Sequence, residues 1–408
     1  MAFFAMADAR CRQRGVRVYI PEYHAKEILA QYGVTIPDGG VARTVAEAED
    51  RARALKAERF AVKAQILAGG RGAAGGVVMA PTPSAVGEAA GRLLGSRLVT
   101  AQTDAEGEVV ERIYVEAAIE TAHSLYLAFV IDPTGARPML LGSARGGVEF
   151  EAEAQADPSI LETLHLAHDG AIDKAALGGF LERLDVPEAA RAAVHALIAA
   201  TVRAALRNDA LFVEINPLVI TPAHDAVAVD AKMILDDNAL FRHPEFETTA
   251  REAVRDDYER IARENDLNFV RLEGNIGVVV NGAGLGLATN DMIADAGGRP
   301  ANFMDIRTTA TSFQIARGVE LLLSDPGIKV LLVNVHGGGM TVCDTVAEAL
   351  NFAYSRSDRR VPVVFRAAGQ NADWARSIMK DRRLPHENAT SMRAAVTRAV
   401  AIASGKGA

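Results

Sequence analysis

Continuous apolar runs alternate with amphipathic segments of helical length over the C-terminal third of the chain. The apolar runs predict strands, and the periodic segments between them predict helices. The expected strands are residues 276–280, 301–304, 330–335 and 362–366; the expected helices are a segment ending at 295, then 313–324, 343–355 and two closing helices. Apolar strands that alternate with helices are typical of a parallel, doubly wound sheet.

Shorter strands and helices alternate from about residue 18 to about residue 240. Residues 22–29 predict a helix that ends before Gly33. Residues 61–67 and 77–79 predict two strands on either side of a glycine-rich loop. The character of the pattern changes near residue 270, which predicts a domain boundary there.

The segment Glu214-Ile-Asn-Pro-Leu218 follows the apolar residues 211–213, and we expect its proline to end that strand. A second strand is predicted at 227–230 after a turn at 222–225. A hairpin of these two strands would bring Asn216 and Asp230 together. Amide and carboxylate oxygens suit Mg²⁺, with nucleotide phosphates and water completing its shell. The alternative is that Asn216 caps a turn and Asp230 lies on a solvated strand end.

The first glycine-rich loop, residues 68–76, contains a G-x-G-x-x-G match at Gly70, Gly72 and Gly75. Because the predicted context is strand–loop–strand, with no helix after the glycines, the match does not indicate a dinucleotide site. No Gly-Lys-Ser/Thr follows, so the loop is not a Walker loop either. It can fold over nucleotide phosphates, with Lys63 and Arg71 adding positive charge. A flexible hairpin tip is the alternative.

Two further glycine loops follow strands of the predicted parallel sheet. Residues 281–286 precede a helix, and Asp305 lies about 20 residues on, as in a dinucleotide site, although the spacing is G-x-G-x-G. Residues 337–339 end a later strand and precede a helix that begins near Cys343. Two such loops at one sheet edge indicate an anion held between them, or only tight turns. Cys343 is interpreted as a packed small residue, with a lowered thiol pKa as the alternative.

The composition changes this picture little. The chain has 408 residues, a net charge of −8 and a sequence pI near 5.7, without a basic stripe that would indicate nucleic-acid binding. We expect no membrane partner, because no apolar run reaches spanning length, and a cytoplasmic location. The two cysteines predict neither a disulfide framework nor a zinc site. Residues 1–17 are expected to be a disordered extension.

The chain resembles the β subunits of ADP-forming succinyl-CoA synthetase, an enzyme of the tricarboxylic acid cycle, and of malate–CoA ligase. The matching stretches run in order along the chain: 22–27, 62–65, 68–72, 98–103, 214–221, 230–232, 237–242, 274–277, 280–285 and 300–303. The resemblance implies an ATP-grasp domain at 18–260, a linker at 261–274 and a flavodoxin-like CoA-ligase domain at 275–408.

The resemblance also implies a role for particular residues. Lys63 and Gly70-Arg71-Gly72 are similar to the triphosphate-binding lysine and loop, and Glu116 is similar to a residue on the adenine side of the ATP site. Asn216 and Asp230 are similar to the Mg²⁺ ligands. Glu214 is similar to the carboxylate that steadies a phosphohistidine. Contacts to the organic acid are implied for Asn281, Gly338, Gly339, Met340 and Thr341.

In this family the phosphohistidine and the main CoA site belong to an α subunit, and nothing in this chain resembles them. The resemblance therefore implies half of an enzyme, which works as an αβ heterodimer or as a heterotetramer of two α and two β subunits. The implied reaction converts ATP, an organic acid and CoA to ADP, phosphate and acyl-CoA, through phosphohistidine and acyl phosphate, with Mg²⁺ at the ATP.

The chain departs from the family pattern at three places. Asp305-Ile-Arg307 and the following threonines replace a glycine run, His336 and Val342 replace a phenylalanine and an arginine around the last glycine loop, and Ser124 replaces a glutamate. The first two places lie at the expected acid site, where Arg307 would meet the far end of the substrate. We therefore expect an acid other than plain succinate: malate, another dicarboxylate or a sulfonated acid.

Three rival classes are weaker. A single-chain ATP-grasp ligase that does not use CoA leaves the second domain without a role. A dinucleotide-dependent oxidoreductase explains residues 276–305 but not the pair Asn216 and Asp230. A non-catalytic, nucleotide-binding regulatory subunit would be favoured by loss of Lys63, Asn216 or Asp230, and all three are present.

Overall fold

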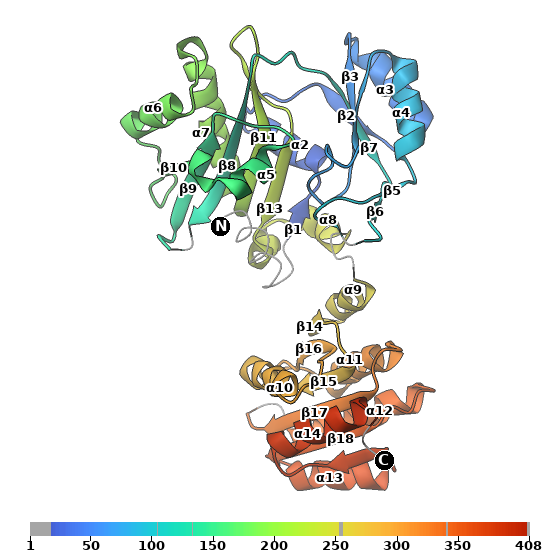
Figure 1. Ribbon diagram of the computed structural model, residues 1–408. Coiled ribbons are helices and arrows are strands. Elements are labelled where there is room, and N and C mark those ends of the chain that lie inside the picture. The colour runs from blue at the N-terminus through green and yellow to red at the C-terminus, as the bar shows by residue number, and fades with distance from the viewer. Residues whose placement is uncertain (1–17, 104, 133, 253–255, 340–341, 406–408) are drawn as a thin grey trace. The chain divides into compact units, whose positions relative to one another are not determined.

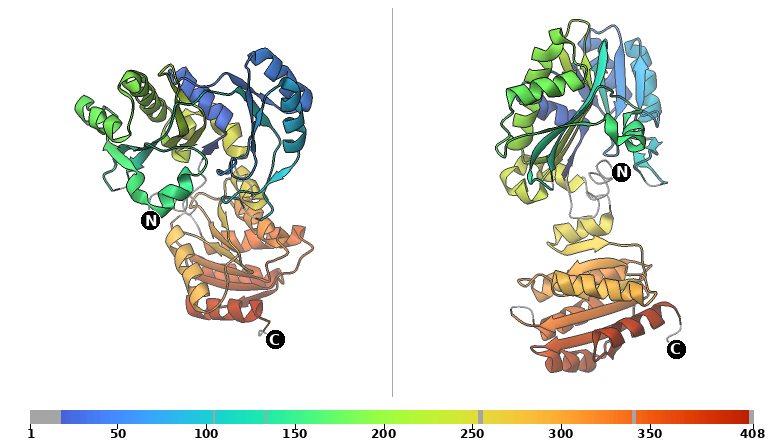
Figure 2. Two further views of the ribbon diagram at one scale, coloured as in Figure 1. Left: turned by 45° about the horizontal axis from the view of Figure 1, so that its top comes forward. Right: turned by 60° about the vertical axis from the view of Figure 1, so that its left-hand side comes forward.

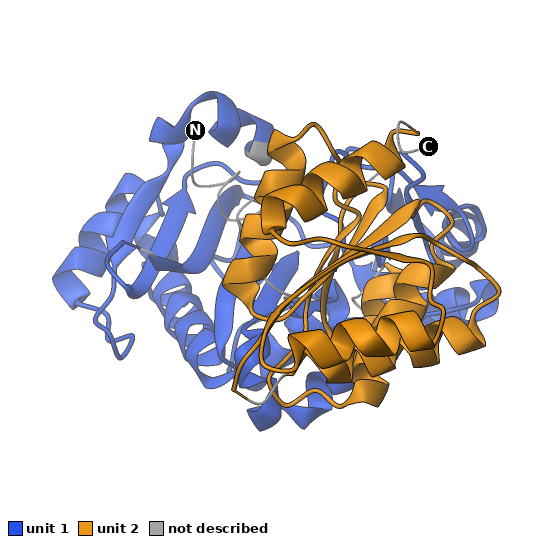
Figure 3. Cartoon of the chain, turned by 90° about the horizontal axis from the view of Figure 1, so that it is seen from below, with its two compact units in different colours: residues 1–253 blue, residues 254–408 orange. Residues whose placement is uncertain are grey.

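The chain divides into two compact units, residues 1–253 and 254–408 (Figure 3). The computed structural model describes residues 18–408 except 104, 133, 253–255, 340–341 and 406–408. The expectation for residues 1–17 therefore lies outside the described residues. Each unit has its own sheets (Figure 1). Each also has its own hydrophobic core.

The larger sheet of the first unit has seven strands in the order β1-β13-β11-β8-β9-β10, with β12 also paired to β11. All of its pairings are antiparallel. The strands are β1 Val18–Ile20, β8 His123–Asp132, β9 Arg137–Ser143, β10 Glu162–His165, β11 Ala210–Ile220, β12 Ala226–Ala228 and β13 Ala231–Leu235. Their alternating apolar side chains supply the largest core cluster.

A second sheet in the same unit has the order β2-β7-β3-β4 and is also antiparallel. Its strands are β2 Gly39–Ala42, β3 Phe60–Ala64, β4 Val77–Ala80 and β7 Ile113–Ala117, and a two-stranded sheet, β5 Arg97–Leu98 and β6 Glu108–Val109, follows β4 in the chain. Helices α3 (Val45–Leu55) and α4 (Pro83–Leu93) cover its outer face (Figure 1). Both helices begin at a threonine whose hydroxyl caps the first turn.

The larger sheet packs on α2 (Glu22–Gln31), α6 (Lys174–Arg183) and α7 (Arg191–Arg207), as Figure 2 shows. Its other face carries α5 (Phe150–Ala156). Short 3-10 helices and α8 complete the unit: η1 Pro158–Ile160, η2 Glu188–Ala190, η3 Asp237–Arg242, η4 Pro244–Phe246 and α8 Glu247–Glu252.

One stretch among the described residues, Glu188–Arg207, has the length and apolar composition of a membrane span. The expectation that no run reaches that length was therefore wrong. Half of the stretch is buried inside the protein, and α7 contributes residues such as Leu197 and Ile198 to the core beside β11. A core helix that is apolar on most of its surface passes the same test of composition.

The second unit contains the predicted doubly wound sheet, in the order β14-β16-β15-β17-β18-β19. The strands are β14 Asn268–Arg271, β15 Ile276–Val280, β16 Asn302–Asp305, β17 Val330–Gly337, β18 Val363–Gly369 and β19 His386–Asn388. All pairings are parallel except that of β14 with β16. Apart from β14, the order is that of flavodoxin-like folds. The segment 261–274, expected to be a linker, contains β14 and the end of α9 (Asp257–Glu264).

Five helices cover the two faces of this parallel sheet. One face packs on α11, α12 and α13, and the other on α10 and α14. Their bounds are α10 Ala283–Asp295, α11 Ser312–Ser324, α12 Cys343–Arg356, α13 Ala372–Asp381 and α14 Met392–Ala403, and α9 (Asp257–Glu264) precedes the sheet. The helices and apolar strands predicted from the sequence are therefore confirmed here, whereas β14 and β19 were not foreseen.

Candidate active site

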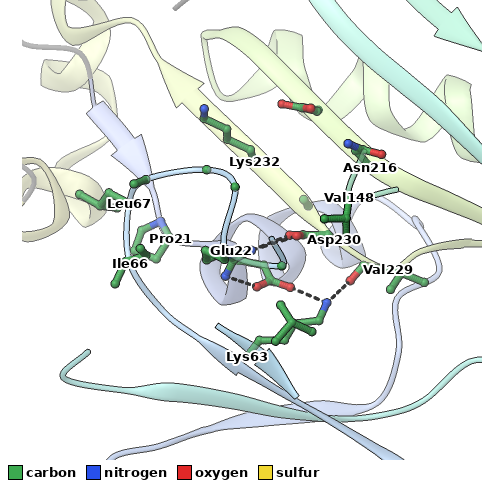
Figure 4. A pocket seen from close by; sticks show the side chains of 18 of the residues that line it. Pro21, Glu22, Lys63, Ile66, Leu67, Val148, Asn216, Val229, Asp230 and Lys232 are labelled. Atoms are coloured by element: carbon green, nitrogen blue, oxygen red, sulfur yellow. Dashed lines mark hydrogen bonds and ion pairs between the residues drawn. The ribbon is translucent and has the colours of Figure 1, made fainter. Parts of the chain in front are cut away.

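A pocket of about 230 Å³ lies within the first unit, and both of its sheets contribute to the lining (Figure 4). The smaller sheet supplies Lys63 at the end of β3 and the loop Gly69–Gly72 that follows. The larger sheet supplies Glu214, Asn216 and Asp230. The segments that lie far apart in the sequence and were singled out above therefore meet in one cavity.

The hairpin that carries Asn216 differs from the prediction at the proline. Strand β11 does not end there: it continues to Ile220, and its register with β8 shifts by one residue between Ile215 and Leu218. Pro217 lies in this bulge, where a residue without a backbone N–H disturbs the ladder least. The bulge lets Ile215 and Leu218 both reach the core, while Asn216 and Pro217 line the pocket.

The hairpin does place the two expected metal ligands opposite each other. The backbone N–H of Asn216 donates to the carbonyl of Asp230 at 3.2 Å, and Val229 N–H donates to the carbonyl of Pro217 at 3.2 Å. The Asn216 amide oxygen accepts from Gly147 N–H at 2.7 Å. Both side chains line the pocket, as Figure 4 shows.

Glu214 precedes Asn216 by two residues and therefore faces the same side of β11. It is directly opposite Lys232 of β13 in the strand register. Both residues line the pocket. The carboxylate expected to act on a phosphohistidine thus lies beside a lysine and on the same wall as the expected metal ligands.

The loop after β3 is a hairpin connection, because β3 and β4 pair antiparallel on either side of it. Gly70 has a φ of +74°, a left-handed conformation that only glycine adopts at little cost. Gly70, Arg71 and Gly72 all line the pocket. The guanidinium of Arg71 is buried and turns back into the protein, where it donates to the carbonyl of Ala64 at 2.9 Å.

Six charged side chains form what we call the charge cluster: Glu22, Lys26, Lys63, Arg71, Glu116 and Asp230. Lys63 Nζ lies 3.0 Å from Glu22 Oε1 and 2.7 Å from Glu116 Oε1. Arg71 lies 2.6 Å from Glu22 Oε2, and its other terminal nitrogen contacts both Asp230 oxygens at 3.0 and 2.9 Å. Three cations and three carboxylates therefore balance one another.

The carboxylates and cations of this cluster fix one another's ionisation. Burial raises the pKa of the Glu22 carboxyl, but Lys63, Arg71 and Lys26 outweigh it and hold that pKa well below its ordinary value. Burial lowers the pKa of the Lys63 ammonium, and Glu22, Glu116 and Asp230 more than reverse this, so that the pKa lies above its ordinary value. Both groups are therefore charged at neutral pH.

Glu116 is the last residue but one of β7 and is almost completely buried. Its two oxygens contact Lys63 and Lys26, and it is not among the residues that line the pocket. The contact with the adenine side of a nucleotide that the resemblance implied stays a prediction. In this structure the carboxylate of Glu116 holds the two lysines.

Asn216 and Asp230 fit a Mg²⁺ ion in the way that nucleotide-binding enzymes use. Together they offer an amide oxygen from β11 and a carboxylate from the connection between β12 and β13, because the strand predicted at 227–230 ends at Ala228. Among the described residues, no group of three or more His, Cys, Asp or Glu side chains is placed to hold a metal alone. Because Mg²⁺ is commonly held by one or two protein oxygens plus phosphates and water, this donor set suits a metal that arrives with a nucleotide.

The second unit brings Asn281 to the carboxyl end of its sheet. The Asn281 amide bridges β15 to β17: its Nδ2 donates to the carbonyl of His336 at 2.7 Å, and its Oδ1 accepts from His336 N–H at 2.8 Å. In the neighbouring loop Asp305 Oδ1 accepts from Gly282 N–H at 2.5 Å. Two of the three glycine loops are therefore tied together at one sheet edge, where ligands bind in such folds.

The other residues expected at this edge are placed in part. Arg307 follows β16, is half-exposed, and its guanidinium lies 2.5 Å from Asp266. Gly338 and Gly339 are exposed beyond β17, and Gly339 has a φ of +61°. Met340 and Thr341 lie outside the described residues.

Cys343 begins α12 and is buried, with its Sγ near the carbonyl of Ala368 at 3.3 Å. Burial raises the pKa of its thiol. The interpretation as a packed small residue is therefore confirmed, and the alternative of a lowered thiol pKa was wrong.

Glu22 and Lys26 are site residues that the sequence analysis did not single out. They lie four residues apart on the face of α2 that also buries Ala25, Ile28 and Leu29. Charged side chains at helix positions whose neighbours form a core are rarely tolerated unless they are paired. Charged residues on the apolar face of the predicted helix were therefore the feature of the sequence that could have identified Glu22 and Lys26.

The comparisons with known proteins agree with this architecture. The ATP-grasp domain model matches residues 19–220 and the CoA-ligase model matches residues 279–404. ATP citrate lyase from Methanothrix soehngenii, solved with citrate and coenzyme A, has a TM-score of 0.66 to this chain at 19% identity and covers 95% of this chain and 100% of its own. At that identity the likeness shows the fold alone. The chain is thus an ATP-grasp protein with a CoA-ligase domain.

Curated relatives define the family more narrowly. The ADP-forming succinate–CoA ligase subunit beta of Wolinella succinogenes is 42% identical over 369 residues, which cover 90% of this chain and 93% of the relative. The corresponding subunits of Acidiphilium cryptum and Burkholderia vietnamiensis are 40% and 38% identical and cover 90% and 95% of this chain. This chain belongs to the family of β subunits of ADP-forming succinate–CoA ligases, which are acid–thiol ligases.

Proposed function

We propose that this chain is the β subunit of an acid–CoA ligase that uses ATP and works with an α subunit carrying a phosphohistidine and the CoA site. The overall reaction is ATP + acid + CoA ⇌ ADP + phosphate + acyl-CoA. One observation carries the proposal: Lys63 and the Gly69–Gly72 loop face Glu214, Asn216 and Asp230 across a single pocket. Cations for phosphates and oxygens for a metal are what phosphoryl transfer from ATP requires.

Each part of the pocket has a role in this proposal. Lys63 and the loop around Arg71 bind the phosphates, Asn216 and Asp230 hold Mg²⁺, and Glu214 orients the α-subunit histidine that accepts the γ-phosphoryl group. Bound Mg²⁺ would neutralise charge on the phosphate oxygens. The phosphoryl group passes from the histidine to the acid, and CoA then displaces phosphate from the acyl phosphate.

The acid is proposed to bind at the carboxyl edge of the second unit's sheet, beside Asn281, Arg307 and the glycines after β17. Arg307 supplies a half-exposed cation at that edge, where its guanidinium lies 2.5 Å from Asp266. The names of the relatives specify succinate. Because Arg307, His336 and Val342 change the cations and shape of the expected acid site, we propose malate, another dicarboxylate or a sulfonated acid as the substrate.

A regulatory subunit without catalysis is less well supported. Such a subunit has no need of the metal and phosphate groups, yet Lys63, Asn216 and Asp230 line the same pocket. A ligase that does not use CoA is disfavoured by the match to the CoA-ligase domain model over residues 279–404.

The test is ADP formation by this chain co-expressed with an α-type subunit, with Mg²⁺ and CoA, across succinate, malate, glutarate, itaconate and sulfoacetate. Turnover with one acid that requires both chains is expected. ATP consumption by this chain alone, indifferent to CoA, would refute the proposal. A kcat/KM for succinate far above that of every other acid would refute only the assignment of the substrate.

A further inference from the structure

We propose that Glu22 is a positioning residue for nucleotide binding, which aligns the phosphate-binding cations of one sheet with the metal-binding oxygens of the other. The inference rests on the nucleotide site proposed above. Glu22 is the first residue of α2, directly after β1 of the larger sheet. Lys63 and Arg71, which it holds, belong to the smaller sheet and its loop.

The contacts of Glu22 divide between its two oxygens. Oε1 lies 3.0 Å from Lys63 Nζ and 3.1 Å from Lys26 Nζ. Oε2 lies 2.6 Å from Arg71 and accepts from Gln65 Nε2 at 3.0 Å. One buried carboxylate therefore contacts Lys63 and Arg71, two of the three cations that line the pocket, and Figure 4 shows it between Lys63 and the loop.

A second contact ties Lys63 to the larger sheet at the same place. Its Nζ donates to the carbonyl of Val229 at 2.8 Å, next to Asp230. Without Glu22, the ammonium of Lys63 would keep Glu116 and Val229, but Arg71 would keep, among the described residues, Asp230 and the carbonyl of Ala64 alone. Asp230 is the residue that a metal would engage, so Glu22 is the partner that can hold Arg71 in place when Asp230 binds metal.

The electrostatic effect and the positioning role of Glu22 predict opposite changes in nucleotide affinity for the substitution Glu22→Gln. Glu22→Gln removes a negative charge beside the pocket, so the field alone would strengthen binding of an anion. If Glu22 aligns the cations, the same change weakens nucleotide binding, because cations that are out of position lose more binding free energy than the removal of one negative charge supplies. We expect at least a tenfold weaker Kd for Mg·ADP, which corresponds to about 1.4 kcal/mol.

The experiment is isothermal titration calorimetry of Mg·ADP into the full chain complexed with its α-type subunit. The matched control is Glu27→Gln, which makes the same change of charge at an exposed position of the same helix. Glu22→Asp keeps the charge but shortens the reach, and it should also weaken binding. ADP binding to Glu27→Gln should equal that of the wild type.

A double substitution separates alignment from stability. Glu22→Gln with Lys26→Met leaves two cations, Lys63 and Arg71, facing two carboxylates, Glu116 and Asp230. The thermal stability lost in Glu22→Gln should largely return, while Mg·ADP affinity stays at least tenfold reduced. If the double variant regains wild-type affinity, or if Glu22→Gln binds ADP as well as the wild type, the positioning role is refuted. If the wild type does not bind Mg·ADP at all, the proposed function fails and the inference with it.

Discussion

Lys26 offers a test of the charge cluster that does not depend on any ligand. Its side chain is completely buried, and its ammonium contacts Glu22 and Glu116. It does not line the pocket. Lys26→Met keeps much of the side-chain volume but leaves the three carboxylates facing two cations. Removing one partner of a buried ion pair costs about 3–5 kcal/mol, since the remaining charge is uncompensated.

The expected shift follows from that magnitude. In a unit of this size, each 1 kcal/mol lowers Tm by about 2–4 °C, so Lys26→Met should lower the first unfolding transition by about 6–20 °C. Glu116→Gln should cost a similar amount for the same reason. The double variant restores the balance of charge and leaves one buried amide partly unsatisfied, at about 1–3 kcal/mol. It should therefore be more stable than either single variant.

The assay is calorimetry of the full chain together with amide hydrogen exchange in β3 and β7, which reports on the unit that contains the cluster. Lys174→Met, at an exposed position of α6, is the control and should shift stability by no more than about 0.5 kcal/mol. Strictly additive losses in the double variant would show that Lys26 and Glu116 are not coupled. That result would refute the reasoning.

Four other predictions concern single groups. The stability contributed by Glu22 should be fully present above the ordinary pKa of glutamate, about 4.3, and it should be lost as the pH falls through the lowered pKa of Glu22. The stability contributed by Lys63 should be fully present below the ordinary pKa of lysine, about 10.4, and it should be lost as the pH rises through the raised pKa of Lys63. The free energy of unfolding of Glu22→Gln should therefore differ from that of the wild type by a constant amount between about pH 5 and 9. Asp230→Asn should weaken Mn²⁺ binding in the presence of ADP at least tenfold, measured by electron paramagnetic resonance, because it removes a charged ligand. Arg307→Gln should raise the KM of the acid about tenfold and leave that of ATP unchanged in steady-state assays. Cys343, studied in a Cys11→Ser background, should resist thiol reagents in the native protein and react after unfolding, because it is buried with a raised pKa.

Matched controls and contrary outcomes are available for each. A difference between Glu22→Gln and wild type that varies steadily across neutral pH would contradict the assigned ionisation. Asp225→Asn changes an exposed carboxylate in the same hairpin and should leave Mn²⁺ binding intact; equal loss in both variants would exclude a specific ligand role. Arg382→Gln is the exposed control in the second unit, and an unchanged acid KM in Arg307→Gln would remove Arg307 from the site. Rapid native labelling of Cys343 would contradict its burial.

The sequence predicted the second unit well because its pattern is strong. Residues 276–280 and 330–335 are buried on both faces and, apart from Asn334, apolar, and each segment is followed by a helix of ordinary length. Strand β19, His386-Glu-Asn388, has no apolar residue, and it forms at the edge of the sheet by pairing with β18. Strand β14 is likewise mostly exposed. Tertiary pairing decides such short strands, so local propensity does not reveal them.

The site residues divide in a similar way. Asn216 and Asp230 were predicted as neighbours because a hairpin has few ways to fold, and the backbone hydrogen bond between them follows from that geometry. The bulge at Pro217 was missed because the rule that proline ends a ladder has an exception at bulges. Partners 40 to 160 residues apart, such as Glu22 with Lys63 or Arg71 with Asp230, depend on how the two sheets of the unit meet. No local sequence pattern predicts how these two sheets pack against each other.

The same meeting of sheets explains why the cluster consists of charges and not of apolar side chains. With apolar residues at Glu22, Lys26 and Glu116, Lys63 would lose both carboxylates that it contacts, and Arg71 would keep Asp230 as its carboxylate partner. A buried charge that is not compensated costs several kcal/mol. The carboxylates that balance Lys63 and Arg71 allow these two cations to be buried beside the pocket. Asp230 differs from the other two carboxylates because it is partly exposed and contacts only Arg71 in the cluster. A metal bound at Asp230 would compete with Arg71 for the same oxygens, and it would leave the guanidinium of Arg71 to Glu22 and to the phosphates of a bound nucleotide. The charge of the cluster would therefore be better balanced with nucleotide and metal bound together than with either of them bound alone.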